Sequence, residues 1–179
     1  MRVITGTARG RKLKEPGGMN IRPTTDQVKE SIFNIIQFDV EGRAVLDLFA
    51  GTGQLGIEAL SRGAESAVFV DENTEAIKLV KENLKHCGLD GQVYQTESLS
   101  FLKRCGKFGL IFIDPPYDSG LAEKALEKII EFDILREGGI IICETRSTTT
   151  LPSVREPYFR GKEYRYGKVK LTTYGREGK

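Results

Sequence analysis

The sequence has little histidine, cysteine and proline, and these shortages exclude several classes of protein. Among its 179 residues, His86 is the single histidine, and Cys87, Cys105 and Cys143 are the three cysteines. The cysteine number is odd and no pair has C-x-x-C spacing, so a disulfide framework and a zinc site are both disfavoured. We therefore expect reduced, buried thiols and no bound metal.

Long hydrophobic runs are also lacking. No stretch approaches the roughly 18 apolar residues of a membrane span, and the opening MRVITGTARGRKLK is basic where a signal peptide would be apolar. With 39% apolar residues, 29% charged residues and six prolines, the composition is that of a folded chain. We expect a single domain over 1–179, located in the cytoplasm and monomeric, since no coiled-coil pattern is present.

The charge is unevenly distributed along the chain. Residues 1–22 hold six Lys/Arg and one acid, and residues 151–179 hold eight Lys/Arg and three acids, so each end carries +5. The net charge of the whole chain is only +2, which leaves −8 for the middle. Basic ends on an acidic body suggest a polyanionic partner. The alternative is that both ends are solvated and frayed.

Strands and helices alternate through the middle of the chain. The apolar runs and periodicities predict a strand–helix series that is listed here in chain order: strand 44–49, helix 54–62, strand 66–71, helix 74–86, strand 92–95, helix 98–104, strand 108–114, helix 120–132 and strand 138–144. Such alternation indicates a parallel sheet covered on both faces. Before this series we expect short strands at 2–5 and 11–14 and a helix over 24–37 capped by Thr24 or Thr25.

The end of the chain breaks this alternation. Residues 157–166 and 168–174 are predicted to be two strands joined around Gly167 with no helix between them, which makes the last pairing antiparallel. The predicted fold is therefore α/β and Rossmann-like, with a seven-stranded, mostly parallel sheet and an antiparallel C-terminal hairpin strand. Residues 1–39 form a basic N-terminal extension with its helix, and residues 40–179 form the core.

A glycine-rich turn follows the first predicted parallel strand. Read literally, GTGQLG (51–56) is G-x-G-x-x-G, and Asp71 lies 20 residues beyond Gly51. The pattern indicates a nucleoside-type ligand whose ribose hydroxyls meet the carboxylate, and it also fits NAD. Asp47, four residues before Gly51, is poorly placed beside a pyrophosphate but well placed for an ammonium group. S-adenosylmethionine carries such a group and has no phosphate.

A second motif, Asp114-Pro115-Pro116-Tyr117, directly follows the strand FGLIFI. Its prolines end the strand and stiffen the turn. An exocyclic amino group on a base is a poor nucleophile because its lone pair is delocalised into the ring. The Asp114 carboxylate and the Pro115 carbonyl can accept its two hydrogens and aim the lone pair, while Tyr117 stacks on the base. A dehydrogenase has no use for this motif.

A weaker signal follows the third predicted strand. Glu97-Ser98 falls where an adenine-reading pair would lie, with Glu97 accepting a hydrogen bond from the adenine amino group. The alternative is that Glu97 is an acidic residue favoured by the dipole at the start of a helix.

With these motifs, the chain resembles a class I S-adenosylmethionine-dependent methyltransferase, and in particular the RsmD family, which methylates the N2 amino group of a guanine in 16S ribosomal RNA. The similar segments are RVITGTARGRKL at the start, IRPTTDQVKESIFNII (21–36), VLDLFAGTGQLGIEALSRGA (45–64), FIDPPY (112–117) and YGKVKLTTYGRE (166–177). The family often has Asn-Ala where this chain has Glu97-Ser98.

The resemblance implies roles for particular residues. The expected donor-binding residues are Asp47, Phe49, Ala50, Gly51, Thr52, Gly53, Asp71, Glu97 and Ser98, and the expected catalytic turn is Asp114, Pro115, Pro116 and Tyr117. The resemblance also places Arg22 and Thr24 near the donor and the target base.

The basic N-terminal extension gives a separate expectation. We expect its cationic side chains to contact RNA phosphates: Arg2, Arg9, Arg11, Lys12, Lys14 and Arg22.

The implied partner is 16S ribosomal RNA, within an assembling small ribosomal subunit. A short basic extension leaves no room for a separate duplex-reading module, so a preformed RNA surface with a flipped-out base is the better fit. Three alternatives stay open on sequence alone: an N6-adenine methyltransferase acting on DNA or RNA, an NAD-dependent dehydrogenase, and a catalytically silent RNA-binding module.

Overall fold

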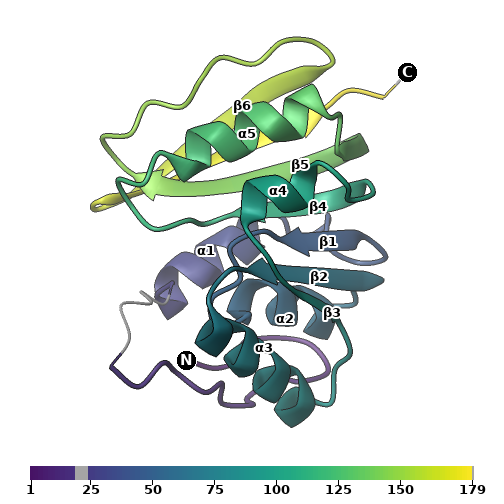
Figure 1. The fold of residues 1–179 in the computed structure, drawn as a ribbon, viewed down its shortest axis with the longest axis vertical. Coiled ribbons are helices and arrows are strands. Elements are labelled where there is room, and N and C mark those ends of the chain that lie inside the picture. Colours follow the sequence, from purple (N-terminus) through teal and green to yellow (C-terminus); the bar gives the residue numbers. More distant parts are fainter. Residues whose placement is uncertain (19–23, 179) are drawn as a thin grey trace.

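A computed structural model describes residues 1–18 and 24–178, which form a three-layer α/β fold (Figure 1). The helices are α1 (Asp26–Ile35), α2 (Gln54–Ser61), α3 (Thr74–Cys87), α4 (Ser98–Leu102) and α5 (Leu121–Glu131). The strands are β1 (Ala44–Asp47), β2 (Ser66–Asp71), β3 (Gln92–Gln95), β4 (Phe108–Ile113), β5 (Leu135–Arg146), β6 (Tyr158–Tyr166) and β7 (Val169–Arg176).

The sheet has the predicted seven strands, in the order β3-β2-β1-β4-β5-β7-β6. Strands β1 to β5 pair in parallel, whereas β7 runs antiparallel to both β5 and β6. The hairpin turns at Gly167, whose φ of 59° suits a residue without a side chain. The strand order reverses direction between β1 and β4, and in open sheets of this type a ligand crevice lies at that point, outside the carboxyl ends of the strands.

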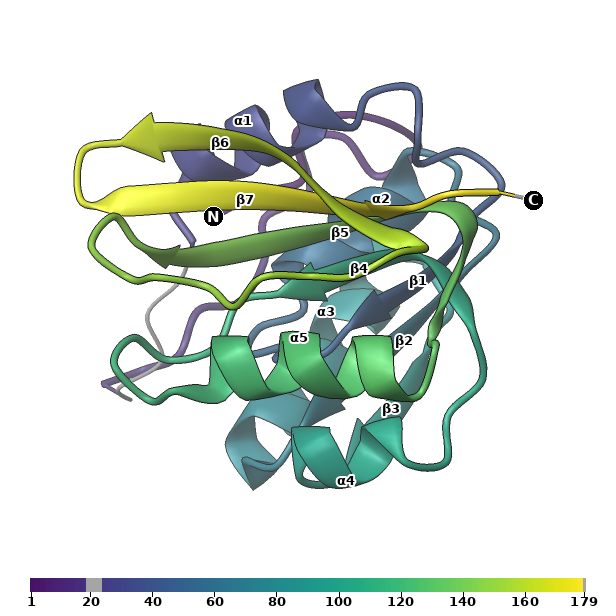
Figure 2. The same ribbon diagram turned by 90° about the horizontal axis from the view of Figure 1, so that it is seen from above.

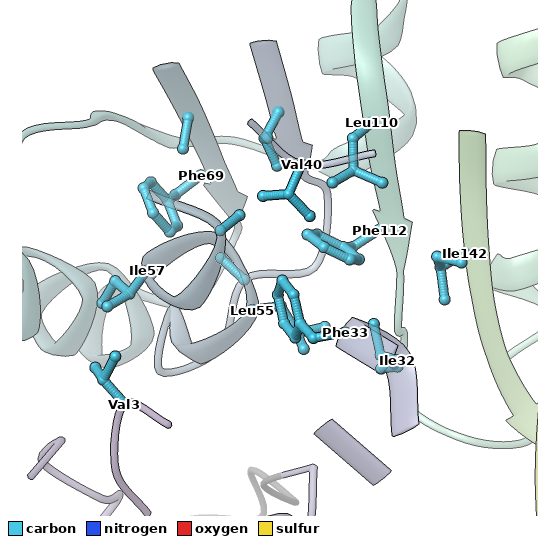
Figure 3. Packing of buried hydrophobic residues seen from close by; sticks show 14 of the residues in the cluster. Val3, Ile32, Phe33, Val40, Leu55, Ile57, Phe69, Leu110, Phe112 and Ile142 are labelled. Carbon is cyan, nitrogen blue, oxygen red and sulfur yellow. The ribbon is translucent and has the colours of Figure 1, made fainter. Parts of the chain in front are cut away.

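Two hydrophobic clusters fill the spaces on either side of the sheet. Figure 2 shows α1 and α2 on one side of the sheet and α4 and α5 on the other. Figure 3 shows the first cluster, in which Phe33 of α1 lies 5.8 Å from Phe112 of β4 between ring centroids. Gly56 lets α2 lie close to β2, because a Cβ at this position would come within 2.3 Å of the Phe69 ring.

The N-terminal extension is docked on the core and does not form the two short strands expected at 2–5 and 11–14. Where the two strands were expected, the described backbone forms one isolated antiparallel β-bridge, between Arg2 and Lys12. Buried Glu58 of α2 holds the extension, because its carboxylate accepts hydrogen bonds from the backbone N–H groups of Ile4 and Thr5 at 2.9 and 3.0 Å. The frayed-terminus alternative is therefore wrong for this end of the chain.

Further polar contacts fasten the same segment. Asn83 of α3 is fully buried, and its side chain accepts a hydrogen bond from the Lys14 N–H and donates to the carbonyls of Lys14 and Thr52. The fully buried Lys29 donates to the Arg2 carbonyl and lies 3.6 Å from Glu58 Oε2. The extension is thereby tied both to α2 and α3 and to the glycine-rich turn that contains Thr52.

Strand β5 is longer than the predicted 138–144. It begins at Leu135, and it continues to Arg146 because the antiparallel β7 pairs with it as far as Arg146 and Val169. Its parallel neighbour β4 ends earlier, at the level of Cys143. The last residues of β5 therefore extend beside the turn that follows β4.

Within residues 1–18 and 24–178, no helix combines the length and the apolar character needed to cross a bilayer. The three cysteines are free thiols, with Cys87 and Cys143 buried and Cys105 half-buried.

Candidate functional site

A cavity of about 860 Å³ opens at the carboxyl ends of β1, β2 and β4. It brings together the two motifs that the sequence singles out, the glycine-rich turn and the Asp-Pro-Pro-Tyr turn. Its wall consists of Thr24, Asp47, Phe49, Ala50, Gly51, Thr52, Gln54, Leu55, Asp71, Glu72, Asn73, Glu97, Ser98, Asp114, Pro115, Pro116, Tyr117, Leu121, Glu144 and Arg146.

The glycine-rich turn connects β1 to α2 and forms one end of the cavity. Ala50 N–H donates to the Val70 carbonyl at 2.9 Å, and Gly53 N–H donates to the Ala50 carbonyl at 2.7 Å. Gly51 and Gly53 have φ values of 56° and 81°, which lie in the left-handed region that favours glycine. The turn therefore presents backbone and no Cβ at Gly51, so a ligand can approach it closely.

Asp71 at the end of β2 closes this turn. One carboxylate oxygen accepts a hydrogen bond from the Gly51 N–H at 2.9 Å, and the other accepts from the Asn73 N–H at 2.9 Å. A carboxylate can accept several hydrogen bonds at once, so these contacts orient the side chain and still permit hydroxyl donors from a ligand.

Asp47 at the end of β1 is almost entirely buried, at 2% exposure. Burial raises the pKa of Asp47 to about 7; the Gly56 N–H, which donates to it at 3.0 Å, opposes this shift, and the charges of Asp114 and Asp71 add to it. Asp47, Asp71 and Asp114 thus line one cavity and interact electrostatically, which favours a ligand that carries positive charge.

Glu97 and Ser98 stand at the start of α4. The two Glu97 carboxylate oxygens accept hydrogen bonds from the N–H groups of Leu99 and Ser100 at 2.9 and 2.7 Å, as a helix N-cap does. Ser98 donates to the Leu48 carbonyl at 2.8 Å and so joins α4 to the end of β1. Both residues line the cavity, and the capping contacts support the structural interpretation of Glu97.

The Asp114–Tyr117 turn forms the other end of the cavity. Thr25 accepts the N-cap hydrogen bond of α1, so the neighbouring Thr24 is available for a different contact. Its hydroxyl donates to Asp114 Oδ2 at 2.7 Å, and its carbonyl accepts from the side-chain amide of Gln54 at 3.0 Å. These bonds orient the Asp114 carboxylate from two other elements of the fold.

Tyr117 is held from β5. Its hydroxyl donates to Glu144 Oε1 at 3.1 Å, and the Arg146 guanidinium lies 5.1 Å from the centre of its ring. Arg146 in turn donates to Asp118 at 2.9 Å. The aromatic face is therefore fixed at the mouth of the cavity, beside a cation that is itself anchored.

The cavity contains most of the residues expected from sequence, but not all. Gly53 stands just behind the wall as the N-cap of α2. Arg9, Arg11 and Lys12 are exposed on the docked extension and do not line the cavity. Arg22 lies outside the described residues.

Seven residues of the wall were not anticipated: Gln54, Leu55, Glu72, Asn73, Leu121, Glu144 and Arg146. Gln54, Glu72 and Asn73 are sequence neighbours of the recognised motifs, so adjacency is a signal that could have identified them. Glu144 was expected only as the end of a buried strand, and nothing in its local sequence indicates a site.

Comparison with known proteins gives a consistent family assignment. Residues 1–175 match the family described as Conserved hypothetical protein 95. YlbH of Bacillus subtilis, named as a candidate rRNA methyltransferase, is 42% identical over 99% of this chain and 100% of its own length. Ribosomal RNA small subunit methyltransferase D of Escherichia coli is 33% identical over 99% of this chain and 90% of that protein. The structure of YhhF from Escherichia coli, described as a candidate methyltransferase, is 32% identical, has a TM-score of 0.89 and covers 99% of this chain and 98% of its own.

Proposed function

This chain belongs to the RsmD family of ribosomal RNA methyltransferases, and on that premise we propose that it transfers a methyl group from S-adenosylmethionine to the N2 amino group of a guanine in 16S ribosomal RNA. One observation carries the proposal. A single cavity contains the glycine-rich turn at one end and the Asp-Pro-Pro-Tyr turn at the other.

The first end fits S-adenosylmethionine. Asp71 would hold the ribose hydroxyls, the Ala50–Gly53 turn would lie against the nucleoside, and the buried Asp47 would pair with the cationic amino-acid part. Gln54 also lines this cavity, and its buried side-chain oxygen accepts no hydrogen bond from the described residues, which suits a donor on a ligand. When bound, S-adenosylmethionine supplies an electrophilic methyl group on a positively charged sulfur.

The second end prepares the nucleophile. The Asp114 carboxylate and the Pro115 carbonyl accept the two amino hydrogens, which draws the nitrogen lone pair out of conjugation and directs it at the methyl carbon. Thr24 keeps Asp114 in the accepting orientation, and the Tyr117 ring stacks on the base. As the nitrogen–carbon bond forms and the carbon–sulfur bond breaks, the nitrogen becomes acidic and loses one proton along its hydrogen bond to Asp114.

The exposed basic residues of the docked extension would contact RNA. Arg9, Arg11 and Lys12 are exposed on a segment that is tied to the cavity through Thr52 and Asn83. Phosphate contacts there would hold the RNA while the target base is flipped into the cavity, in a preformed rRNA surface such as an assembling small subunit.

The decisive experiment is methyl transfer from labelled S-adenosylmethionine, followed by nucleoside analysis. The substrates are small ribosomal subunits and free 16S RNA from cells that lack this protein. We expect label in N2-methylguanosine. Label in N6-methyladenosine would overturn the guanine assignment while preserving the mechanism, and absence of label with proven donor binding would overturn ribosomal RNA as the substrate.

A matched variant tests the proposed chemistry. Asp114→Asn keeps the shape of the side chain but removes the charge, so we expect transfer to fall at least about a hundredfold while the affinity for S-adenosylmethionine is retained. Glu127→Gln is the control, since Glu127 is an exposed carboxylate of α5 that does not line this cavity. Full activity of Asp114→Asn would contradict the mechanism.

A further inference from the structure

A second carboxylate lies beside the catalytic turn, and its position bears on which base the cavity accepts. Glu144 is buried at 3% exposure and lines the same cavity as Asp114. Its Oε1 atom accepts a hydrogen bond from the Tyr117 hydroxyl at 3.1 Å. The proposed chemistry of the amino group uses Asp114 and Pro115 and leaves Glu144 without a role.

The strand register explains why the two carboxylates are neighbours. Ile113, the last residue of β4, pairs with Cys143 of β5; Asp114 directly follows the end of β4, and Glu144 is the next residue of β5. Residues at the same level on neighbouring strands point to the same face of a sheet. Glu144 is kept in the strand at this level because β7 pairs with it through Leu171.

The edges of guanine and adenine differ in the hydrogen-bonding character of N1, and a carboxylate can pair with only one of the two. Beside its N2 amino group, guanine has an N1–H donor, so this edge offers three hydrogens. Adenine has an N1 acceptor beside its N6 amino group, so that edge offers two hydrogens and a lone pair. The cavity offers three acceptors in this region: the Asp114 carboxylate, the Pro115 carbonyl and the Glu144 carboxylate.

We propose that Glu144 is the specificity-determining residue for guanine, because its carboxylate accepts a hydrogen bond from the guanine N1–H while the amino group is held at Asp114 and Pro115. The Tyr117 hydroxyl, which donates to Oε1, sets the orientation of this carboxylate. Adenine would place its N1 lone pair against the same negative charge. A site that hydrogen-bonds a particular substrate group discriminates strongly against analogues that lack it.

This inference rests on the proposed guanine-N2 activity, and a base analogue separates the two. 2,6-Diaminopurine keeps the amino group at C2 but has no hydrogen on N1. The target nucleotide, located first by mapping the N2-methylguanosine product, is replaced by guanosine or 2,6-diaminopurine in ligated 16S RNA, which is then assembled into small subunits. If mapping finds no N2-methylguanosine, the proposed function itself fails before Glu144 is tested.

The first test uses the wild-type protein and does not depend on any variant. We expect kcat/KM for guanosine to exceed that for 2,6-diaminopurine by at least about a hundredfold. Equal rates on the two substrates would overturn the proposal.

The second test uses the Glu144→Gln variant. The amide can still accept from Tyr117 but can also turn its NH₂ group toward an N1 lone pair, so we expect the preference for guanosine to shrink at least about tenfold. A merely structural role would lower both rates equally and leave their ratio unchanged, and that result would also overturn the proposal. Glu127→Gln, the same change at an exposed position of α5, is the matched control and keeps the wild-type ratio.

Discussion

The Thr24 hydroxyl donates a hydrogen bond of 2.7 Å to Asp114 Oδ2, although 90 residues separate the two in sequence. This contact joins the segment before α1 to the turn after β4, and it determines the direction in which the Asp114 carboxylate faces. The proposed mechanism needs that direction, because the other carboxylate oxygen must meet an amino hydrogen of the base.

Thr24→Val removes this hydroxyl but keeps the branched shape of the side chain. We expect kcat to fall about tenfold or more, since small errors in the position of a catalytic group are costly, while the affinity for S-adenosylmethionine stays near the wild-type value. Single-turnover transfer and calorimetry with the donor measure the two quantities. Thr24→Ser restores the hydroxyl and should restore most of the rate; equal activity of the Val and Ser variants would refute a positioning role.

Asp47→Asn is expected to stabilise the protein while weakening donor binding. Burial raises the pKa of Asp47 to about 7 from its ordinary value of 3.8, so the stability associated with its protonated form is complete below about pH 4 and is lost as the pH rises through about 7. Asparagine does not ionise, so the variant does not lose stability as the pH rises through this range. In the absence of donor, its free energy of unfolding should exceed that of the wild type by about 2 kcal/mol or more at pH 8, by less at pH 5, and not at all near pH 3.5.

Urea unfolding at several pH values measures this difference, and calorimetry measures the accompanying loss of donor affinity. Asp90→Asn, at an exposed site in the loop between α3 and β3, is the control and should follow the wild-type profile. A variant that gains no stability at pH 8 would show that Asp47 is not held in a costly ionised state.

The basic extension is expected to contribute phosphate contacts. Replacing Arg9, Arg11 and Lys12 together by Ala should weaken RNA binding and make its salt dependence shallower by about 2 in the logarithmic slope, since each phosphate contact contributes about 0.7 to 0.9. Titrations at several salt concentrations measure this slope. The control variant removes the same number of charges from exposed positions on or next to α4 and α5, at Lys103, Arg104 and Lys124, and an equal effect from it would indicate a non-specific charge effect.

The buried Glu58 is expected to hold the extension in place. It accepts hydrogen bonds from Ile4, Thr5 and the Arg62 guanidinium, and it faces the buried Lys29, whose pKa burial lowers despite the nearby carboxylate. Glu58→Gln removes the charge that both cations need, so we expect a loss of about 3 kcal/mol in unfolding free energy.

Hydrogen exchange at the Ile4 or Thr5 amide should accelerate in the same variant, because the glutamine side chain keeps only one of the two oxygens that accept from these N–H groups and presents an NH₂ group to the other. Glu65→Gln, an exposed carboxylate a few residues beyond α2, is the control and should change neither quantity. Slow exchange at both amides in Glu58→Gln would mean that the extension is held by its apolar contacts alone.

The local sequence determined the order of elements and the two motifs. Apolar runs of strand length and helical periodicities depend on near neighbours in the chain, so the series from 44 to 144 could be predicted closely. The same holds for the turn at Gly51–Gly53 and for the prolines after β4, because backbone conformation there depends on the residues themselves.

The tertiary structure alone decided which polar side chains face the site and which are buried elsewhere. Glu58 and Lys29 would ordinarily be assigned to the surface from sequence, yet both are fully buried because they satisfy each other and the backbone of the extension. Glu97 fits both an adenine contact and a helix cap in sequence, and its carboxylate caps α4. Glu144 lies in the site because the register between β4 and β5 places it at the level of Asp114. That register depends on pairing between segments that are far apart in the chain.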